Sequence, residues 1–454
     1  MVRIYDTLSE RKVELKKTDK QIKMFVCGPT VYDYAHLGHA RTEVAFDVIA
    51  RYLRSAGYDV FYLENITDVD DKIIVRAVNE KTTPQIIAKR FEREFLKDMK
   101  AIKVTSVSKR ARASSFIKEI QNQIQRLLDK NFAYKTSSGI YFDIKKFSDY
   151  GKLSKQNLDE LRPGWRIELD SEKKDPIDFA LWKFGKEELS WPSPWGVGRP
   201  GWHIEDTAIT EKIFGQQYDL HGGGLDLKFP HHESEIAQQE SVSGKKPFVR
   251  IWMHSGFLLV DGEKMSKSLN NFITIKDFLG KFSANVLRFL IISSHYRSPI
   301  NYNDAVVRQV VSSMGTIEDF LGKLNLIKLK NGGEINISAG DYENEFIESM
   351  NDDFNTPQAL AAVFKLINDY QDKIWKLNKA EAQYLKNWIT EKLNLFGLII
   401  KKPVIPMEAK KLIKEREKLR MQKKFNESDL LRRRIESLGY NVEDTPAGPF
   451  YKPC

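Results

Sequence analysis

The first hundred residues alternate between short apolar runs and longer segments of helical spacing. Residues 23–27 and 60–63 are apolar runs of strand length, and Gly28 stops the first of them. Between these runs, apolar side chains recur at helical spacing until Gly57, and residues 83–102 form a second, longer amphipathic segment. This β-α-β-α order is typical of a parallel sheet with crossover helices, so it predicts an α/β fold.

Length and composition limit the class of protein. The chain has 454 residues, of which 41% are hydrophobic and 30% are charged. These values exclude collagenous and low-complexity proteins, and the length suits about three domains. No apolar run approaches the ~18 residues of a membrane span, so we expect no membrane partner. The two cysteines, Cys27 and Cys454, lie far apart in the sequence, which favours a reducing, cytoplasmic location.

The pattern of residues changes at several points and divides the chain into five segments. A stretch rich in tryptophan, proline and glycine precedes residue 201 and indicates an insertion into the α/β domain. From residue 304 onward the apolar residues have almost entirely helical spacing, and a break with two prolines follows residue 402. We therefore predict the first half of the sheet domain at 1–111, an insertion at 112–200, the second half at 201–303, a helical bundle at 304–402 and a small basic module at 403–454.

Positive charge is concentrated at the C-terminal end. Residues 401–454 contain 14 basic and 8 acidic residues, which contribute +6 of the formal net charge of +10. A basic module beside a large domain is compatible with a phosphate-rich polymer as partner. Charge alone more often indicates a solvated helix than a nucleic-acid-binding module, so the choice between the two depends on the sequence motifs.

Two histidines follow the first predicted strand. His36 and His39 are three residues apart and therefore share a face at the start of the next helix. Gly38 between them removes a side chain that would block close approach, and a helix N-terminus favours anionic groups. The pattern predicts a phosphate site, although histidine pairs at this spacing are also common by chance.

Two later segments carry groups suited to a nucleotide. In KMSKS, Lys264 and Lys267 are three residues apart on a loop, where they could offset the charge that grows on a pyrophosphate leaving group. In HGGGLD, the glycines up to Gly224 could pack against a nucleoside, and Asp226 could accept ribose hydroxyls. Each motif alone is explained by an ordinary loop or turn, but their combination with the histidine pair is far more specific.

Four residues that could hold a metal ion are spread over the chain. His231 and Glu235 are four residues apart and share a helix face. Cys27 stands at the end of a predicted central strand, where parallel sheets build active sites, and Asp206 is the candidate fourth ligand. Spacing leaves open that Cys27 is a buried apolar residue and that His231 and Glu235 form a surface pair. It does not choose His231 over His232 either.

Longer stretches of the sequence resemble one family. They include CGPTVYDYAHLGHAR, NITDVDDKI, SPWGVGRPGWHIE, HGGGLDLKFPHHESEIAQ, KMSKS and the closing EDTPAGP. Over nearly its whole length the chain is similar to the cysteinyl-tRNA synthetases, a family of class I aminoacyl-tRNA synthetases. The resemblance implies a Rossmann-type parallel-sheet catalytic domain with an inserted connective segment, followed by a helical bundle and a basic anticodon-binding module.

The resemblance also implies roles for single residues. His36 and His39 match the HIGH motif of the family, with leucine in place of isoleucine, and Lys264 and Lys267 match its KMSKS loop. These four are the expected catalytic residues, and by resemblance Lys267 contacts an ATP phosphate. The expected ATP-binding residues add Gly224 and Asp226 to the four, and the expected residues around the amino acid are Gly28, Thr67 and Trp202.

The family holds one zinc ion with two cysteines, a histidine and a glutamate, and this chain departs from that set once. Cys27, His231 and Glu235 match three of the ligands, whereas Asp206 stands where the family has its second cysteine. Aspartate is itself a zinc ligand and has the same formal charge as a thiolate. We therefore expect one Zn²⁺ per chain in a Cys-Asp-His-Glu site. The rival hypothesis is that Asp206 points away and that metal binding is weak or lost.

The implied activity is the ATP-dependent joining of L-cysteine to tRNA(Cys) through a cysteinyl-adenylate, with Mg²⁺ accompanying ATP and zinc selecting the substrate thiolate. The resemblance also implies a monomer, and it matches Phe425 to an aromatic position near the anticodon. A core residue of a small helical bundle is an equally good interpretation of Phe425.

Two other classes of protein are the alternatives. One is a cysteine-activating ligase that uses an amino sugar in place of tRNA, and the basic C-terminal module argues against it. The other is a non-enzymatic nucleic-acid-binding paralogue, and the intact histidine pair and lysine loop argue against that.

Overall fold

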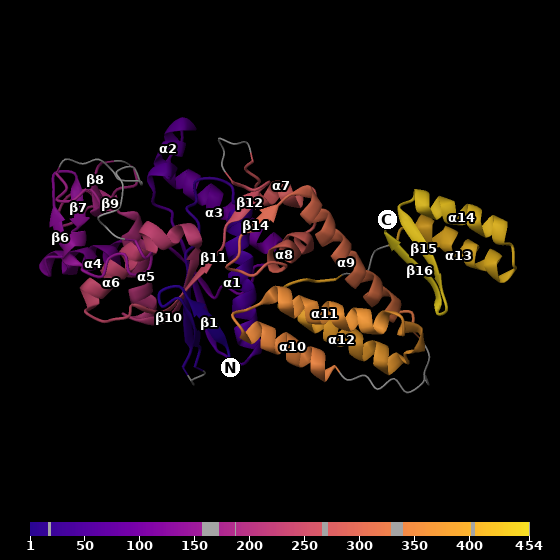
Figure 1. The fold of residues 1–454 in the computed structure, drawn as a ribbon. Coiled ribbons are helices and arrows are strands. Elements are labelled where there is room, and N and C mark those ends of the chain that lie inside the picture. Colours follow the sequence, from indigo (N-terminus) through magenta and orange to yellow (C-terminus); the bar gives the residue numbers. More distant parts are fainter. Residues whose placement is uncertain are drawn as a thin grey trace. The chain divides into compact units, whose positions relative to one another are not determined.

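The computed structural model describes residues 1–16, 20–156, 172–186, 188–265, 271–327, 339–400 and 405–453. The chain divides into two compact units (Figure 1). The first contains Met1–Val306 together with Ser349–Pro357, and the second contains Val307–Glu348 and Gln358–Cys454. Within the described ranges, no helix combines the length and the hydropathy that a membrane span would need.

A five-stranded parallel sheet forms the centre of the first unit, and it confirms the predicted α/β fold. Its strand order is β11-β10-β3-β4-β5, and every neighbouring pair is parallel. The carboxyl ends of these strands therefore meet at one edge of the sheet. The strands are β3 (Ile22–Val26), β4 (Val60–Ile66), β5 (Lys109–Arg112), β10 (Tyr218–Gly224) and β11 (Val249–Ser255).

Helices with well-defined ends connect the first strands. Helix α1 (Leu37–Ser55) ends just before Gly57, whose φ of 82° is a conformation that glycine adopts without strain. Helix α2 (Asp71–Asn79) follows β4. Helix α3 (Pro84–Ala101) begins after Thr83, whose side chain accepts a hydrogen bond from the Ile86 backbone N–H. Helices α1 and α3 are the ones that the apolar spacing and the Thr-Pro start signal predict, whereas α2 was not predicted.

The part of the chain between β5 and β10 forms a second, smaller layer of structure. It contains an antiparallel sheet of order β6-β7-β8-β9, which lies on the left in Figure 1. A cluster of buried apolar residues, among them Phe25, Phe142 and Trp182, continues from the central sheet into this layer. The elements are α4 (Ile117–Asp129), β6 (Ala133–Lys135), β7 (Gly139–Phe142), β8 (Phe179–Phe184), β9 (Gly198–Pro200) and α5 (Trp202–Phe214).

The rest of the first unit completes the sheet domain. Helix α6 (Glu233–Ser243) connects β10 to β11, and β12 (Leu258–Val260) follows in a small sheet with β13 (Glu263–Lys264) and β14 (Ile300–Tyr302). Helix α8 (Ala284–Ile292) packs on α1, where the buried Arg288 guanidinium donates to the buried Asp47 carboxylate at 2.7 Å. The N-terminal hairpin β1 (Arg3–Asp6) and β2 (Arg11–Glu14) and the short helix α7 (Ile275–Leu279) complete this unit.

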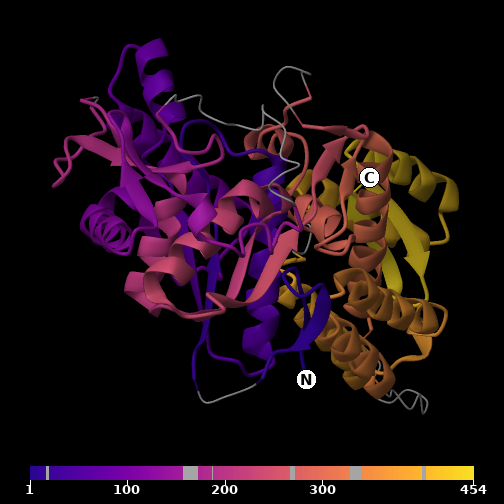
Figure 2. The same ribbon diagram turned by 60° about the vertical axis from the view of Figure 1, so that its left-hand side comes forward.

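Helices make up most of the second unit. Apart from a few end residues of the first three, which belong to the first unit, they are α9 (Asp304–Leu324), α10 (Gly340–Asn351), α11 (Thr356–Gln371), α12 (Lys379–Leu395), α13 (Met407–Met421) and α14 (Phe425–Ser437). Helices α10 and α12 are joined by Glu343, which accepts from Trp388 Nε1 at 2.7 Å and from Lys392 Nζ at 2.8 Å. Helices α13 and α14 pack around Leu412, Leu431 and Ile435. Figure 2 shows these elements turned by 60°.

Two details at the C-terminal end differ from the sequence-based predictions. Residues 410–438, predicted as a basic helical segment with an interruption near Asn426, form the two helices α13 and α14 with a break at residues 422–424. The chain then forms the antiparallel hairpin β15 (Tyr440–Thr445) and β16 (Gly448–Pro453), which the helical spacing did not predict. Phe425 is 54% exposed at the start of α14. It is therefore a surface residue, and the interpretation of Phe425 as a core residue is wrong.

Asp98, on the inner side of α3, gives a pH-dependent stability prediction. Its side chain is buried, with 7% exposure, and burial together with the nearby Glu94 raises its pKa from 3.8 to about 6. Because the folded state binds this proton more tightly than the unfolded state, the ionised carboxyl destabilises the fold as the pH rises through about 6. We expect Asp98→Asn to raise the free energy of unfolding by ~1 kcal/mol at pH 7.5, after allowance for solvent screening.

Thermal unfolding at two pH values tests this prediction. At pH 3.5 the Asp98 carboxyl is largely protonated in both states, so Asp98→Asn and the unmodified chain should unfold at similar temperatures. Asp372 is exposed, so Asp372→Asn serves as a matched control and should not change the midpoint of thermal unfolding at either pH. An Asp98→Asn variant that is no more stable than the unmodified chain at pH 7.5 would contradict the prediction.

Candidate active site and metal centre

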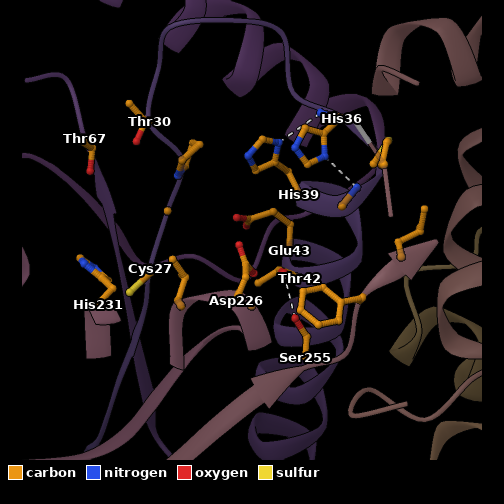
Figure 3. A pocket seen from close by; sticks show the side chains of 18 of the residues that line it. Cys27, Thr30, His36, His39, Thr42, Glu43, Thr67, Asp226, His231 and Ser255 are labelled. Carbon is orange, nitrogen blue, oxygen red and sulfur yellow. Dashed lines mark hydrogen bonds between the residues drawn. The ribbon is translucent and has the colours of Figure 1, made fainter. Parts of the chain in front are cut away.

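A pocket of about 310 Å³ opens at the carboxyl ends of the parallel strands. Cys27 follows β3, Thr67 follows β4, Gly224 ends β10 and Ser255 ends β11, and all four line this pocket. Figure 3 shows Cys27 and His231 on one side of the pocket and His36 and His39 on the other, with Asp226 between them. The pocket therefore contains two groups of functional side chains.

The histidine pair forms the N-terminal cap of α1. His36 is the N-cap residue, and its Nδ1 accepts from the Gly38 backbone N–H at 3.0 Å. In return the His36 backbone N–H donates to Nδ1 of His39 at 3.2 Å. This arrangement is a capping box in which both side chains are imidazoles. A Cβ on residue 38 would lie 2.7 Å from the His36 ring, which explains why glycine stands there.

The capping bonds determine which ring nitrogens face a ligand. Because Nδ1 of each histidine accepts a backbone N–H, the ring proton of the neutral form is on Nε2. Burial lowers the pKa of His39 to about 4, and the nearby Lys72 acts in the same direction. His39 is therefore a neutral hydrogen-bond donor at physiological pH, suited to an anionic oxygen.

The glycines of HGGGLD are strand residues, not a turn. Gly222 and Gly223 lie in β10, where a Cβ would come within 2.4 Å of the Phe46 ring and 2.7 Å of the His232 ring respectively. Asp226 follows in an exposed turn at the mouth of the pocket. Lys264, on β13, also lines the pocket, whereas the predicted Lys267 lies outside the described residues.

The four predicted metal ligands converge at the other end of the pocket. Nε2 of His231 lies 3.0 Å from Asp206 Oδ2 and 3.1 Å from Glu235 Oε1. Sγ of Cys27 lies 3.5 Å from Asp206 Oδ2 and 4.0 Å from Glu235 Oε1. Ligands of a tetrahedral zinc ion at ~2.0 to 2.3 Å stand ~3.4 Å apart, so this donor set fits the ion. Asp206 points into the cluster, contrary to the rival hypothesis.

The acidic groups of this cluster also favour the binding of a cation. Burial raises the pKa of the Cys27 thiol well above its usual value, and Glu235 and Asp206 add to the effect. Burial, with Asp206, likewise raises the pKa of the Glu235 carboxyl. Glu235 Oε2 has no hydrogen-bond partner among the described residues. A divalent cation would compensate three acidic groups in one buried place, so sulfur, nitrogen and oxygen donors here suit Zn²⁺.

A second donor group overlaps with the first. Nε2 of His221 and Nε2 of His232 lie 3.4 Å and 3.2 Å from Cys27 Sγ, so these two histidines with Cys27 and Glu235 could also surround an ion. However, His221 and His232 are buried behind the pocket wall, whereas Cys27, Asp206 and His231 line the pocket. A ligand in the pocket can therefore approach Cys27, Asp206 and His231, but not His221 or His232.

The residues predicted around the amino acid lie beside this cluster. Gly28, Thr67 and Trp202 all line the pocket. The Trp202 ring stacks on His231 with 4.2 Å between the ring centroids, at the start of α5. Helix α6 begins at Glu233, so His231 is not on this helix but in the wider turn that residues Lys228–His232 form before it. His231 and Glu235 nevertheless keep their contact.

Asn65 and Glu43 are among the pocket residues for which the sequence predicted no role. Asn65, near the end of β4, lies within the NITDVDDKI stretch but carried no predicted role. Glu43, one turn after His39 on α1, directs its carboxyl group into the pocket (Figure 3). For Glu43 the only signal is its helical spacing of four from His39, which is common to many surface residues. For Asn65, its position near the end of a buried strand, where polar side chains reach the sheet edge, is the usable signal.

The chain matches known proteins over nearly its whole length. The family described as tRNA synthetases class I (C) catalytic domain matches residues 13–312, and the DALR domain matches residues 345–401. The parallel sheet and its pocket are thus those of a class I aminoacyl-tRNA synthetase.

Relatives with curated names narrow the class. The cysteine–tRNA ligase of Thermococcus onnurineus is 41% identical, and that of Hahella chejuensis is 43% identical, each over 99% of both chains. The cysteine–tRNA ligase of Thermoplasma volcanium is 42% identical over 97% of both chains. The chain belongs to the cysteine–tRNA ligase family.

Solved structures agree at the level of the fold. Methionyl-tRNA synthetase of Mycobacterium tuberculosis, in complex with methionyl-adenylate, superimposes with a TM-score of 0.62 at 16% identity, covering 84% of this chain and 90% of the other. A putative arginyl-tRNA synthetase of Campylobacter jejuni gives a TM-score of 0.54 at 14% identity, covering 86% and 95%. At this identity the likeness concerns the fold.

Proposed function

We propose that this chain joins L-cysteine to tRNA(Cys) in two steps, through a cysteinyl-adenylate. The observation that carries this proposal is a single pocket with a metal-type donor cluster at one end and the histidine cap of α1 at the other. Such a pocket can hold the side chain of an amino acid at the first end and the phosphates of ATP at the second. The family membership supports the same assignment and does not favour the two alternatives.

In the first step the carboxylate of cysteine attacks the α-phosphate of ATP, and pyrophosphate leaves. Nε2–H of His36 and His39 and the amino groups of Lys264 and Lys267 act on the phosphate oxygens, where negative charge develops. Gly224 and Asp226 hold the nucleoside and its ribose hydroxyls. Because positioning and electrostatics suffice for this step, no side chain has to serve as a nucleophile.

Four residues are proposed to hold one Zn²⁺ per chain: Cys27, Asp206, His231 and Glu235. When bound, the ion supplies a bond to the substrate thiolate that the hydroxyl of serine does not match. Trp202, Thr67 and the Gly28 backbone surround the rest of the amino acid. Mg²⁺ is expected to accompany ATP.

In the second step the terminal ribose hydroxyl of tRNA(Cys) takes the cysteinyl group, and AMP leaves. The module at residues 403–454 is proposed to contact the anticodon. Its basic helices α13 and α14 and the exposed ring of Phe425 suit phosphates and unstacked bases. We further propose that the enzyme acts as a monomer in the cytoplasm.

The exchange of pyrophosphate into ATP tests the proposal directly. With cysteine as the only amino acid we expect rapid exchange, and with serine we expect exchange slower by about 10⁴-fold, because the metal distinguishes groups of similar size. Addition of tRNA(Cys) should then yield cysteinyl-tRNA. Exchange with neither amino acid would overturn the activity. Equal exchange with both would overturn selection by zinc while leaving adenylate formation intact.

A further inference from the structure

Asn65 stands between two of the proposed metal ligands without being one of them. It lies near the end of β4 and is buried, with 2% exposure. Its side-chain oxygen accepts from the Gly28 backbone N–H at 2.6 Å, next to Cys27. Its Nδ2 donates to Asp206 Oδ1 at 2.6 Å and lies 3.3 Å from Thr67 Oγ1. One amide group thus connects the end of β3 with helix α5.

The orientation of this amide follows from its partners. The Gly28 N–H can only donate, so the Asn65 oxygen must face it, and the NH₂ group must face Asp206. A Cβ on residue 28 would lie 1.9 Å from the Asn65 backbone oxygen, so glycine is what allows the two strand ends to approach so closely. Asn65 therefore has no alternative orientation that satisfies both bonds.

The two oxygens of Asp206 consequently have different surroundings. Oδ1 is held by Asn65, whereas Oδ2 lies 3.0 Å from His231 Nε2 and 3.5 Å from Cys27 Sγ. We propose that Asn65 is a positioning residue that makes Asp206 a one-oxygen metal ligand. The inference rests on the proposed zinc site and adds to it the hydrogen bond from Asn65 to Asp206.

The chemistry of aspartate explains why such a residue matters in this chain. A free carboxylate can turn about its Cβ–Cγ bond and offer both oxygens to one ion, which raises the coordination number. Zinc that is to accept a substrate thiolate must keep a position open. By bonding one oxygen, Asn65 leaves a single donor atom, as a cysteine at position 206 would have. A cysteine has no second donor atom to restrain, so Asn65 should matter much less beside it.

A double-mutant cycle on zinc affinity tests this dependence. Competition with a chelator measures the zinc affinity of four proteins: the unmodified chain, Asn65→Ala, Asp206→Cys and the double variant. We expect Asn65→Ala to weaken zinc binding by ~10 to 100-fold in the unmodified background. In the Asp206→Cys background we expect Asn65→Ala to change the zinc affinity by less than about threefold, because the hydrogen bond between Asn65 and Asp206 is already absent. The loss of the Gly28 contact is common to both backgrounds and cancels.

The Co²⁺-loaded proteins give a second readout. If Asp206 turns and binds through both oxygens in Asn65→Ala, the coordination number rises and the visible absorption of Co²⁺ weakens. A merely structural role of Asn65 would not change this spectrum. Should Asn65→Ala fold poorly, Asn65→Ser is the second variant, because its short side chain cannot reach both partners.

The outcomes separate the inference from the site on which it rests. A weakened affinity with a changed Co²⁺ spectrum, restricted to the Asp206 background, supports the positioning role. Unchanged affinity in Asn65→Ala, or an equal loss in both backgrounds, overturns it while the zinc site stands. An unmodified chain that binds no zinc overturns the metal site and the inference together.

Discussion

Cys27→Ala should remove most of the bound zinc and sharply reduce the selectivity of this protein for cysteine over serine. The variant removes the only sulfur from the buried donor cluster and leaves Asp206, His231 and Glu235 with one donor too few. We expect zinc to fall to a small fraction of one per chain. The kcat/KM for cysteine-dependent pyrophosphate exchange should fall by about 10³-fold, since the metal bond is worth several kcal/mol. Any remaining preference for cysteine over serine should shrink toward ~10²-fold, the range of an apolar pocket.

Metal analysis and exchange assays on the same preparations measure both effects. The matched control is Cys454→Ala, which removes the chain's other thiol and should leave zinc content and exchange unchanged. Retention of one zinc per chain in Cys27→Ala would show that Cys27 does not hold the ion. The group that contains His221 and His232 would not explain the result either, because it also includes Cys27. Full selectivity without zinc would contradict the proposal that zinc selects cysteine by binding its thiolate.

His39→Ala should slow adenylate formation by about 10² to 10³-fold in kcat. The variant removes an Nε2–H donor from the phosphate end of the pocket, and the loss of one such donor at a developing charge has this magnitude. The KM for cysteine and the zinc content should change little, because His39 lies at the other end of the pocket (Figure 3). Single-turnover measurement of adenylate formation gives the rate directly.

Two comparisons test the proposed role of His39 as a neutral donor. His39→Gln keeps an N–H group near the position of Nε2 and should recover at least tenfold of the lost rate. Because the pKa of His39 is lowered to about 4, its imidazole is uncharged from pH 6 to pH 8. The ratio of the unmodified rate to the His39→Ala rate should therefore stay constant over that range. A tenfold change in this ratio would mean that His39 acts through its charge.

Local patterns predicted most of the elements around the pocket. The apolar run at residues 23–27, the helix that ends before Gly57 and the Thr83-Pro84 start all correspond to observed elements, because their signals lie within a few neighbouring residues. The hairpin β15–β16 was missed. Its strands pack on the short basic helices through residues such as Val442, so it depends on contacts that the local sequence does not contain.

In the candidate site, too, local spacing predicted some groupings of residues and not others. His36, Gly38 and His39 could be grouped from spacing, since one helix turn brings them together. The spacing of four likewise brings His231 to Glu235. Nothing local connects these residues with Cys27 or Asp206, and resemblance to a family was needed to place the four in one set. Neither route indicated that Asn65 holds Asp206, because that bond joins residues 141 positions apart.

Sequence by itself determined the first strands of the sheet, the helices that end before Gly57 and begin at Pro84, and the place of the histidine pair at the start of α1, because these depend on short-range sterics and hydrogen bonding. Only the tertiary structure decided which donors meet, since the parallel register brings the ends of β3, β4 and β10 to one edge and α5 and α6 pack beside them. Asp206 turns inward for that reason. Its direction depends on packing between segments far apart in the chain and on one buried amide.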